Sequence, residues 1–168
     1  DTPEYESFIK LRRSWEQNGY LFDKYIVKRE YANDSADGEW SLKSLYVSGQ
    51  QSKKKPYYRN SKFTKSGEWA STNDWRTKTN IMIQSALRVS YTSPKVMHWI
   101  TKLLIWLSEG DCKHIKNGDI TRFDVVAEEI AIDAVKENFF NVCQDGIYAM
   151  GVNTPHIVFN YLDYLLWY

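Results

Sequence analysis

The sequence is poor in the residues that build disulfide frameworks and metal centres. It has two cysteines, Cys112 and Cys143, which do not form a Cys-x-x-Cys pair. Its three histidines are not paired with one another at metal-ligand spacing. These gaps argue against a disulfide-stapled secreted scaffold and against a zinc module. We therefore expect a cytoplasmic protein, the simpler setting for unpaired cysteines, with no metal and no cofactor.

Long apolar runs are missing as well. One of the longest, from Trp99 to Leu107, contains Lys102 and is far shorter than the roughly 20 residues that a membrane-spanning helix needs. The chain does not open on a basic segment followed by an apolar signal core. We expect neither a membrane span nor a secretory signal.

Common catalytic motifs are absent from the sequence. It has no Gly-rich phosphate loop and no Gly-x-Ser-x-Gly elbow. A metal-dependent hydrolase or nuclease site can be imagined at Asp111, His114 and Asn117, but a second converging cluster is lacking. A turn with solvated polar groups explains these three residues better. We predict no catalytic residue and rank an enzyme last among the interpretations.

The net charge is close to zero, at +1, but the charges are unevenly distributed. Residues 41–80 hold nine basic and two acidic side chains, and residues 109–145 hold nine acidic and four basic ones. A basic segment and an acidic segment are compatible with polyanion binding. They are equally compatible with two faces of one protein attracting each other.

The composition is that of a globular chain. Hydrophobic residues make up 43% and charged residues 26%, which argues against wholesale disorder. A length of 168 residues suits one domain. We predict a single helical domain over residues 1–168. Aromatic residues reach 15%, enough to supply both a core and a surface that meets a partner.

Apolar periodicity and helix-start signals predict an all-α fold, a bundle of about five helices. Asp74 or Thr72 can cap a helix running to about residue 90, and Ser93 and Thr154 each precede a proline that opens a helix. The helix after Thr121 has a wide apolar stripe and should be contacted on two sides. The predicted helices cover residues 3–28, about 74–90, from Pro94 up to the stop at Gly110, from after Thr121 through Val135, and from Pro155 onwards.

Residues 31–73 lack a helical period and form a long polar insertion that can contain one β-hairpin. The insertion includes the run Lys53-Lys54-Lys55-Pro56-Tyr57-Tyr58-Arg59. Basic groups interleaved with tyrosines can follow a phosphate backbone and stack on bases. The alternative is a solvated loop whose lysines keep it soluble. The predicted nucleic-acid-binding residues are Lys53, Lys54, Lys55, Tyr57, Tyr58, Arg59, Lys62 and Lys65.

The two ends of the sequence suggest a piece of a longer polypeptide. The chain starts at Asp1 without an initiator methionine and stops on an apolar run that is costly to expose at a free terminus. A last helix that packs against its own domain is the alternative. We predict a domain-docking surface made of Tyr164, Leu165, Leu166, Trp167 and Tyr168.

Two passages resemble a known family. The first is Gln84-Ser85-Ala86-Leu87-Arg88-Val89-Ser90-Tyr91-Thr92-Ser93, followed by Lys95, His98-Trp99 and Leu103-Leu104; the second is Phe159-Asn160-Tyr161-Leu162-Asp163-Tyr164-Leu165-Leu166-Trp167. Together they resemble the helical middle region of the GmrSD-like modification-dependent restriction endonucleases of bacteria. The resemblance covers residues 75–168. It rests on helix positions and carries over no catalytic residue.

In that family a ParB-like nucleotide-binding domain precedes the helical region and an HNH-type nuclease domain follows it. The run Ser48-Gly49-Gln50-Gln51-Ser52 departs from the family's Asp-Gly-Gln-Gln-Arg motif at both ends and falls in the wrong region. The resemblance implies a non-catalytic connector that lies between other domains of its own parent chain, and the basic segment adds the hypothesis that it contacts DNA. The alternative is a protein–protein interaction module of another pathway. The oligomeric state is left open.

Overall fold

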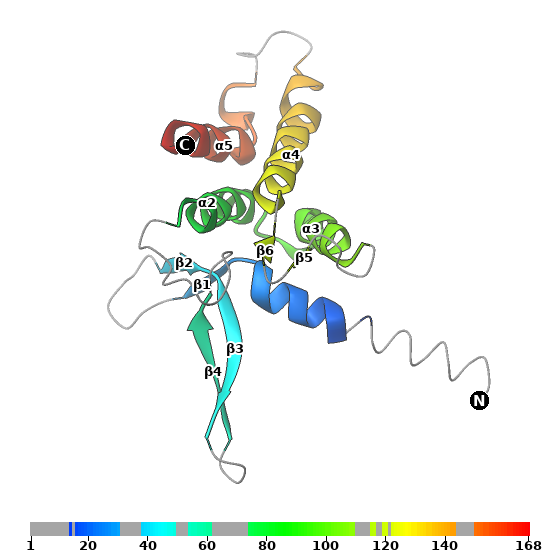
Figure 1. Ribbon diagram of the computed structural model, residues 1–168. Coiled ribbons are helices and arrows are strands. Elements are labelled where there is room, and N and C mark those ends of the chain that lie inside the picture. The colour runs from blue at the N-terminus through cyan, green and yellow to red at the C-terminus, as the bar shows by residue number, and fades with distance from the viewer. Residues whose placement is uncertain are drawn as a thin grey trace, which may run out of the picture. The chain divides into compact units, whose positions relative to one another are not determined.

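The computed structural model describes residues 14, 16–30, 38–49, 54–61, 74–109, 115, 116, 119, 120, 122–143 and 150–168. Most of these residues are helical, and the strands among them form three antiparallel two-stranded sheets (Figure 1). The prediction of a mainly helical fold with a β-hairpin in the insertion is confirmed. The other two strand pairs were not predicted.

The chain forms two compact units, one of residues 1–61 and 104–114 and the other of residues 62–103 and 115–168. The prediction of one domain over residues 1–168 stays a prediction. The first unit contains a helix at residues 16–25, β1 (Lys28–Glu30), β2 (Glu39–Ser41), β3 (Lys43–Ser48) and β4 (Lys55–Asn60). The second unit contains α2 (Trp75–Ser90), η1 (Pro94–Val96), the start of α3 (His98–Ser108), β5 (Ile115–Lys116), β6 (Asp119–Ile120), α4 (Phe123–Val135), the π-helical η2 (Lys136–Phe140), η3 (Gly151–Asn153) and α5 (His156–Trp167). The division between the units falls within α3, after residue 103.

Cross-strand pairs and one ion pair organise the strands of the first unit. In the β1–β2 sheet Arg29 lies opposite Trp40, with the guanidinium carbon 5.4 Å from the centre of the indole ring. The Lys43 ammonium forms an ion pair with Glu30, which links β3 to β1. The backbone N–H of Ser61 donates to the Leu42 carbonyl at 2.8 Å and closes the base of the β3–β4 hairpin.

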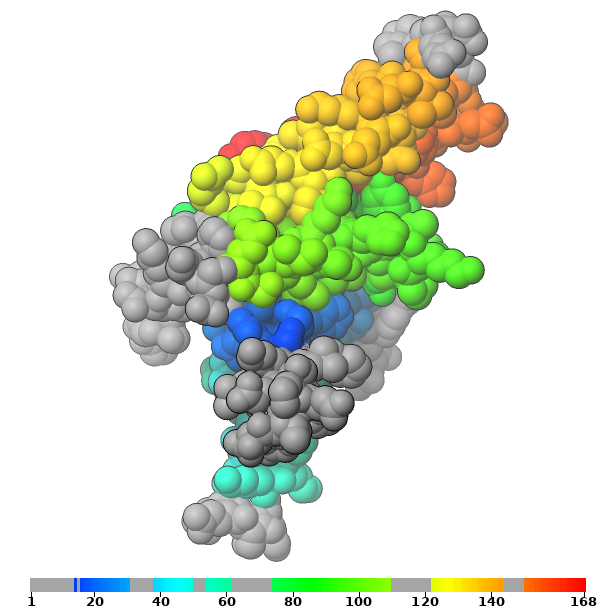
Figure 2. Space-filling view, turned by 90° about the vertical axis from the view of Figure 1, so that its right-hand side faces the viewer, coloured from blue at the N-terminus to red at the C-terminus, as the bar shows by residue number. Residues whose placement is uncertain are grey.

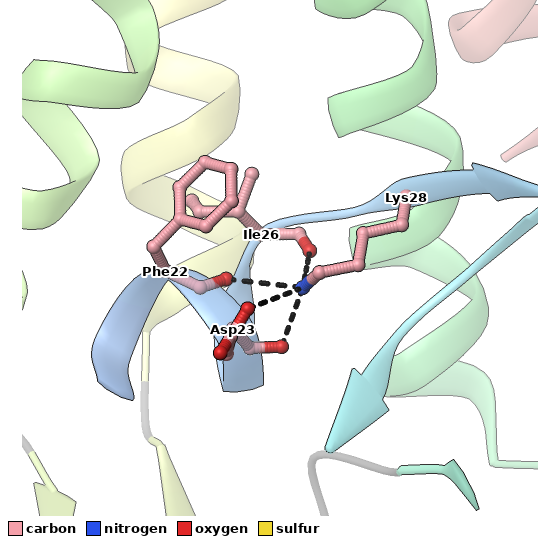
Figure 3. Close-up of polar contacts among 4 residues, drawn as sticks. All are labelled: Phe22, Asp23, Ile26 and Lys28. Carbon is pink, nitrogen blue, oxygen red and sulfur yellow. Dashed lines mark hydrogen bonds and ion pairs between the residues drawn. The ribbon is translucent and has the colours of Figure 1, made fainter. Parts of the chain in front are cut away.

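The first helix ends at residue 25, three residues earlier than predicted, and Lys28 supplies the reason. Its ammonium donates to the carbonyl oxygens of Phe22, Asp23 and Ile26 at 3.3, 2.5 and 3.3 Å (Figure 3). A cation at the helix C-terminus interacts favourably with the last carbonyls, of which that of Phe22 also accepts from the backbone N–H of Ile26 at 3.1 Å. Burial lowers the pKa of the Lys28 ammonium, and the Asp23 carboxylate, 3.9 Å away, opposes that effect in part.

In the second unit α2 packs against α5 and α4, and α4 also packs against α5. Figure 2 shows the side chains of α4, yellow to orange, against the green helical segments. The predicted central helix with contacts on two sides is therefore confirmed. Small side chains at Ala127 and Ala131, both fully buried, permit this close approach. The large buried apolar side chains of α2, α4 and α5 include Ile83, Leu87, Phe123, Val135, Ile157 and Tyr164.

The predicted start of α2 at Asp74 is confirmed. The Asp74 Oδ1 atom accepts a hydrogen bond from the backbone N–H of Thr77 at 3.3 Å, which makes Asp74 the N-cap. A second carboxylate oxygen accepts from the Thr77 hydroxyl. This cap is a local interaction, so three neighbouring residues suffice to predict it.

The two predicted Ser/Thr-Pro caps are wrong in detail. Ser93 makes no side-chain capping bond, and Pro94 opens the short 3-10 turn η1, so that α3 begins only at His98. The Thr154 hydroxyl donates backwards to the Gly151 carbonyl at 2.7 Å and closes η3. Neither hydroxyl caps the helix that follows it. The 3-10 turn η1 separates Ser93 from α3, and the Thr154 hydroxyl is bonded to the preceding turn η3.

The Tyr161 phenol connects α5 to α4. Its hydroxyl donates to Glu128 Oε1 at 3.2 Å. Burial, together with the charge and the hydrogen bond of Glu128, raises the pKa of Tyr161 to about 12. Burial also raises the pKa of the neighbouring Tyr164. Both phenols therefore keep their protons in the folded protein at a pH where an unfolded tyrosine loses its own.

We expect the free energy of unfolding to fall as the pH rises from about 10 to about 12. In this window the folded chain binds more protons than the unfolded chain, so raising the pH favours unfolding. The Tyr161→Phe variant should lose less stability than the unmodified chain over the same window. Urea unfolding at several alkaline pH values measures this. Equal pH dependence of the two proteins would contradict the assignment, and Glu128→Gln should give an intermediate result.

Candidate nucleic-acid interface

The β3–β4 hairpin lies within the predicted basic insertion and has two different faces. Its register pairs Ser44 with Arg59, Tyr46 with Tyr57 and Ser48 with Lys55. Because side chains alternate along a strand, these six residues share one face. We call it the basic-aromatic face: Ser44, Tyr46, Ser48, Lys55, Tyr57 and Arg59. The opposite side carries Lys43 and Asn60 at the base of the hairpin, and its remaining residues, Leu45, Val47, Pro56 and Tyr58, are called the apolar face.

The basic-aromatic face presents two rings and two cations to solvent. The centres of the Tyr46 and Tyr57 rings lie 6.1 Å apart with a tilt of 34°. The two residues are 43% and 44% exposed. Lys55 and Arg59 flank Tyr57 on the same strand, and every residue of β4 is exposed. Aromatic surface and positive charge therefore occur together on the β3–β4 ribbon, whose backbone is drawn in Figure 1.

The structure places five of the eight predicted nucleic-acid-binding residues. Lys54 immediately precedes β4, and Lys55, Tyr57, Tyr58 and Arg59 are on it, all exposed. Lys53, Lys62 and Lys65 lie outside the described residues.

The hairpin register divides the predicted set. Tyr58 points to the apolar face, whereas Lys55, Tyr57 and Arg59 share the basic-aromatic face. Tyr58 was predicted together with them but does not share their face. Tyr46, which the sequence did not single out as a binding residue, joins that surface from β3. The alternation of side chains along the two strands could have indicated this surface, but only if the pairing register between the strands had been known.

The apolar face is exposed along its length. Leu45, Val47 and Tyr58 are each at least half exposed. A soluble two-stranded ribbon is marginally stable alone, and it usually buries one apolar face. The exposed apolar side chains of this face are suited to contact apolar groups rather than phosphates.

A groove of about 470 Å³ runs between the first helix and β3. Tyr20, Asp23 and Lys24 line it from the helix, and Ser44, Leu45 and Tyr46 line it from the strand. The Lys24 ammonium donates to the Tyr20 hydroxyl at 3.1 Å. Tyr46 belongs to both the groove and the basic-aromatic face, so the two features are continuous within the first unit.

The predicted docking surface on α5 is only partly exposed. Tyr164 is 1% exposed and belongs to the core, so its assignment to the docking surface is wrong. The Trp167 indole stacks on Trp75 of α2, with ring centres 5.0 Å apart and planes within 6°. Leu165 and Leu166 remain exposed, as does Tyr168.

Two further α5 side chains that were not predicted extend this surface. Phe159 and Leu162 are about half exposed. Residues 159, 162 and 166 follow a helical period and therefore share one side of α5. The helix has a buried side, carried by Ile157 and Tyr164, and an exposed apolar side.

A second hollow, of about 250 Å³, lies in the second unit among α2, α3 and α4. Its apolar lining includes Leu87, Ile130 and Ala134, and its rim carries Lys102 and Glu137. Burial raises the pKa of the Tyr91 phenol at its edge, and the charge of Glu137 adds to the effect. The hollow offers groups of opposite charge and no nucleophile paired with a base.

The imagined metal site at Asp111, His114 and Asn117 lies outside the described residues. Within the described part of the chain, no three His, Cys, Asp or Glu side chains are grouped so that they can hold a metal ion. The same part contains no helix that is long and apolar enough to span a membrane.

Comparison with known proteins gives no further assignment. The chain matches no protein-family model, no curated protein and no solved structure.

Proposed function

We propose that the chain is a non-catalytic connector that contacts nucleic acid through the basic-aromatic face of its β3–β4 hairpin. The observation that carries the proposal is the exposure of Lys55, Tyr57 and Arg59 on one face beside Tyr46. Cations on an exposed ribbon can approach phosphates without the cost of removing a buried charge from its partner.

The resemblance of residues 84–104 and 159–167 to the GmrSD-like family extends this proposal. In that setting the connector belongs to a cytoplasmic, bacterial restriction enzyme of antiphage defence. A nucleotide-binding domain and a nuclease domain of the same parent chain are its neighbours. The exposed side of α5, with Leu162, Leu165 and Leu166, is suited to dock one of them because its apolar area gains free energy on burial.

The test is a fluorescence-anisotropy titration with a labelled DNA duplex that carries a single-stranded overhang, repeated over a salt series. We expect binding that weakens as salt rises. The double variant Lys55→Gln/Arg59→Gln should reduce the slope of log affinity against log salt by about 1.4 to 1.8, because each phosphate contact contributes about 0.7 to 0.9.

The matched control is Lys95→Gln/Lys136→Gln. It removes the same charge from exposed positions of the second unit and should leave the slope unchanged. If both double variants lower the slope equally, binding reflects overall charge and the hairpin has no special role. Absence of binding at low salt would favour the alternative, a protein–protein interaction module that uses α5 and the apolar face of the hairpin.

A further inference from the structure

The groove beside β3 differs from a phosphate site in its charge. It contains the Asp23 carboxylate together with the Lys24 ammonium, so it is not a purely cationic pocket. The Asp23 carboxylate repels a phosphate, but it can accept hydrogen bonds from the ring N–H or amino groups of a base. The exposed cations of the hairpin, Lys55 and Arg59, lie on the neighbouring face. Phosphate and base functions are thus separated in space.

The rings around the groove supply stacking surfaces. Tyr20 and Tyr46 line it, and Tyr57 lies 6.1 Å from Tyr46 on the adjoining face. The rings are about half exposed, so their surfaces are accessible to a planar ligand. A volume of about 470 Å³ falls within the range of pockets that hold small molecules and single nucleotides, roughly 300 to 1,000 Å³.

A double helix does not use these features well. A two-stranded ribbon can enter the major groove of DNA, where hydrogen-bonding side chains read the base edges. The faces of paired bases are already stacked on one another, so exposed tyrosine rings have nothing to stack on. Unpaired bases are free to stack, and each stacking contact contributes about 1 to 3 kcal/mol.

We propose that the basic-aromatic face and the adjoining groove bind single-stranded nucleic acid, with one unpaired base in the groove. Lys55 and Arg59 hold the phosphates, Tyr46 and Tyr57 stack on bases, and Tyr20 closes the groove over the inserted base. This inference rests on the proposed nucleic-acid contact and specifies the strand state that it recognises.

The experiment compares three labelled oligonucleotides of equal length by anisotropy at low salt: a single strand, its duplex, and a single strand of abasic sugars with the same phosphates. We expect the single strand to bind more tightly than the other two. The Tyr57→Ala variant should weaken single-strand binding roughly 5- to 150-fold, the range that corresponds to one stacking contact. Tyr57→Phe, which keeps the ring, should restore it.

The control is Tyr58→Ala, because Tyr58 is the next residue of the same strand and faces the other way. The Tyr58→Ala variant also removes one aromatic side chain from β4, and it should leave binding unchanged. Tyr20→Ala tests the groove and should weaken the single strand without affecting the abasic one. Equal binding of all three oligonucleotides would overturn the inference and leave phosphate contact standing. No binding to any of them would overturn both proposals.

Discussion

Replacing Phe123 by alanine is expected to lower the free energy of unfolding by about 3 to 5 kcal/mol. Phe123 is the first residue of α4 and is 0% exposed. Truncation removes the transfer free energy of the ring and leaves a cavity that the surrounding helices fill only in part. A loss of this size is a large share of the roughly 5 to 15 kcal/mol that stabilise a typical domain.

Urea unfolding followed by far-ultraviolet circular dichroism measures the effect. The matched control is Phe159→Ala, which makes the same change at a residue of α5 that is 54% exposed. It should change the free energy of unfolding by no more than about 0.5 kcal/mol. If the two variants unfold at the same urea concentration, Phe123 does not belong to the core of the second unit.

Local signals in the sequence were enough to predict most of the helices. Asp74 caps α2 through an interaction with a residue three positions away, and the apolar stripe of α4 is visible in the sequence alone. The end of the first helix was harder to predict. It depends on Lys28, whose ammonium folds back onto carbonyls of the preceding helix from the start of β1. The pattern of apolar residues in the sequence does not predict such a contact.

The candidate site was only partly predictable for a similar reason. The basic run was visible, but a strand has two faces, and a shift of one residue in the register exchanges them. Alternation along β4 puts Tyr57 and Arg59 on one face and Tyr58 on the other, and the register decides that Tyr46 of β3 shares the face of Tyr57. The groove depends on contacts between Tyr20 or Lys24 and a strand some twenty residues away in sequence, which periodicity does not reveal.

Because the two faces of the hairpin point to opposite sides, they restrict which function the exposed apolar residues can have. Leu45 and Val47 lie on the side away from Lys55 and Arg59. A polyanion on the basic-aromatic face therefore leaves Val47 uncovered, whereas Leu45 also lines the groove beside β3. The hairpin can meet nucleic acid on one side and an apolar protein surface on the other. In this arrangement the connector and protein-interaction hypotheses are compatible.

Replacing Ala131 by leucine is expected to lower the free energy of unfolding by about 1 to 3 kcal/mol. Ala131 is 0% exposed on α4, the helix that packs against both α2 and α5. Alanine and leucine have similar helix propensities, so the loss reports packing rather than the tendency to form a helix. The added isopropyl group must displace a neighbouring helix or adopt an unfavourable rotamer.

The same substitution one turn further along α4 provides the sharpest control. Ala134 lines the hollow of about 250 Å³, which has room for a larger side chain. Ala134→Leu should therefore leave the urea midpoint nearly unchanged, while Ala131→Leu lowers it. Because the two variants share their chemistry and their helix, only the space around each position separates them. Equal midpoints would mean that α4 does not pack tightly between α2 and α5, and a connector built on this bundle would then lack the rigidity needed to hold neighbouring domains at a fixed distance.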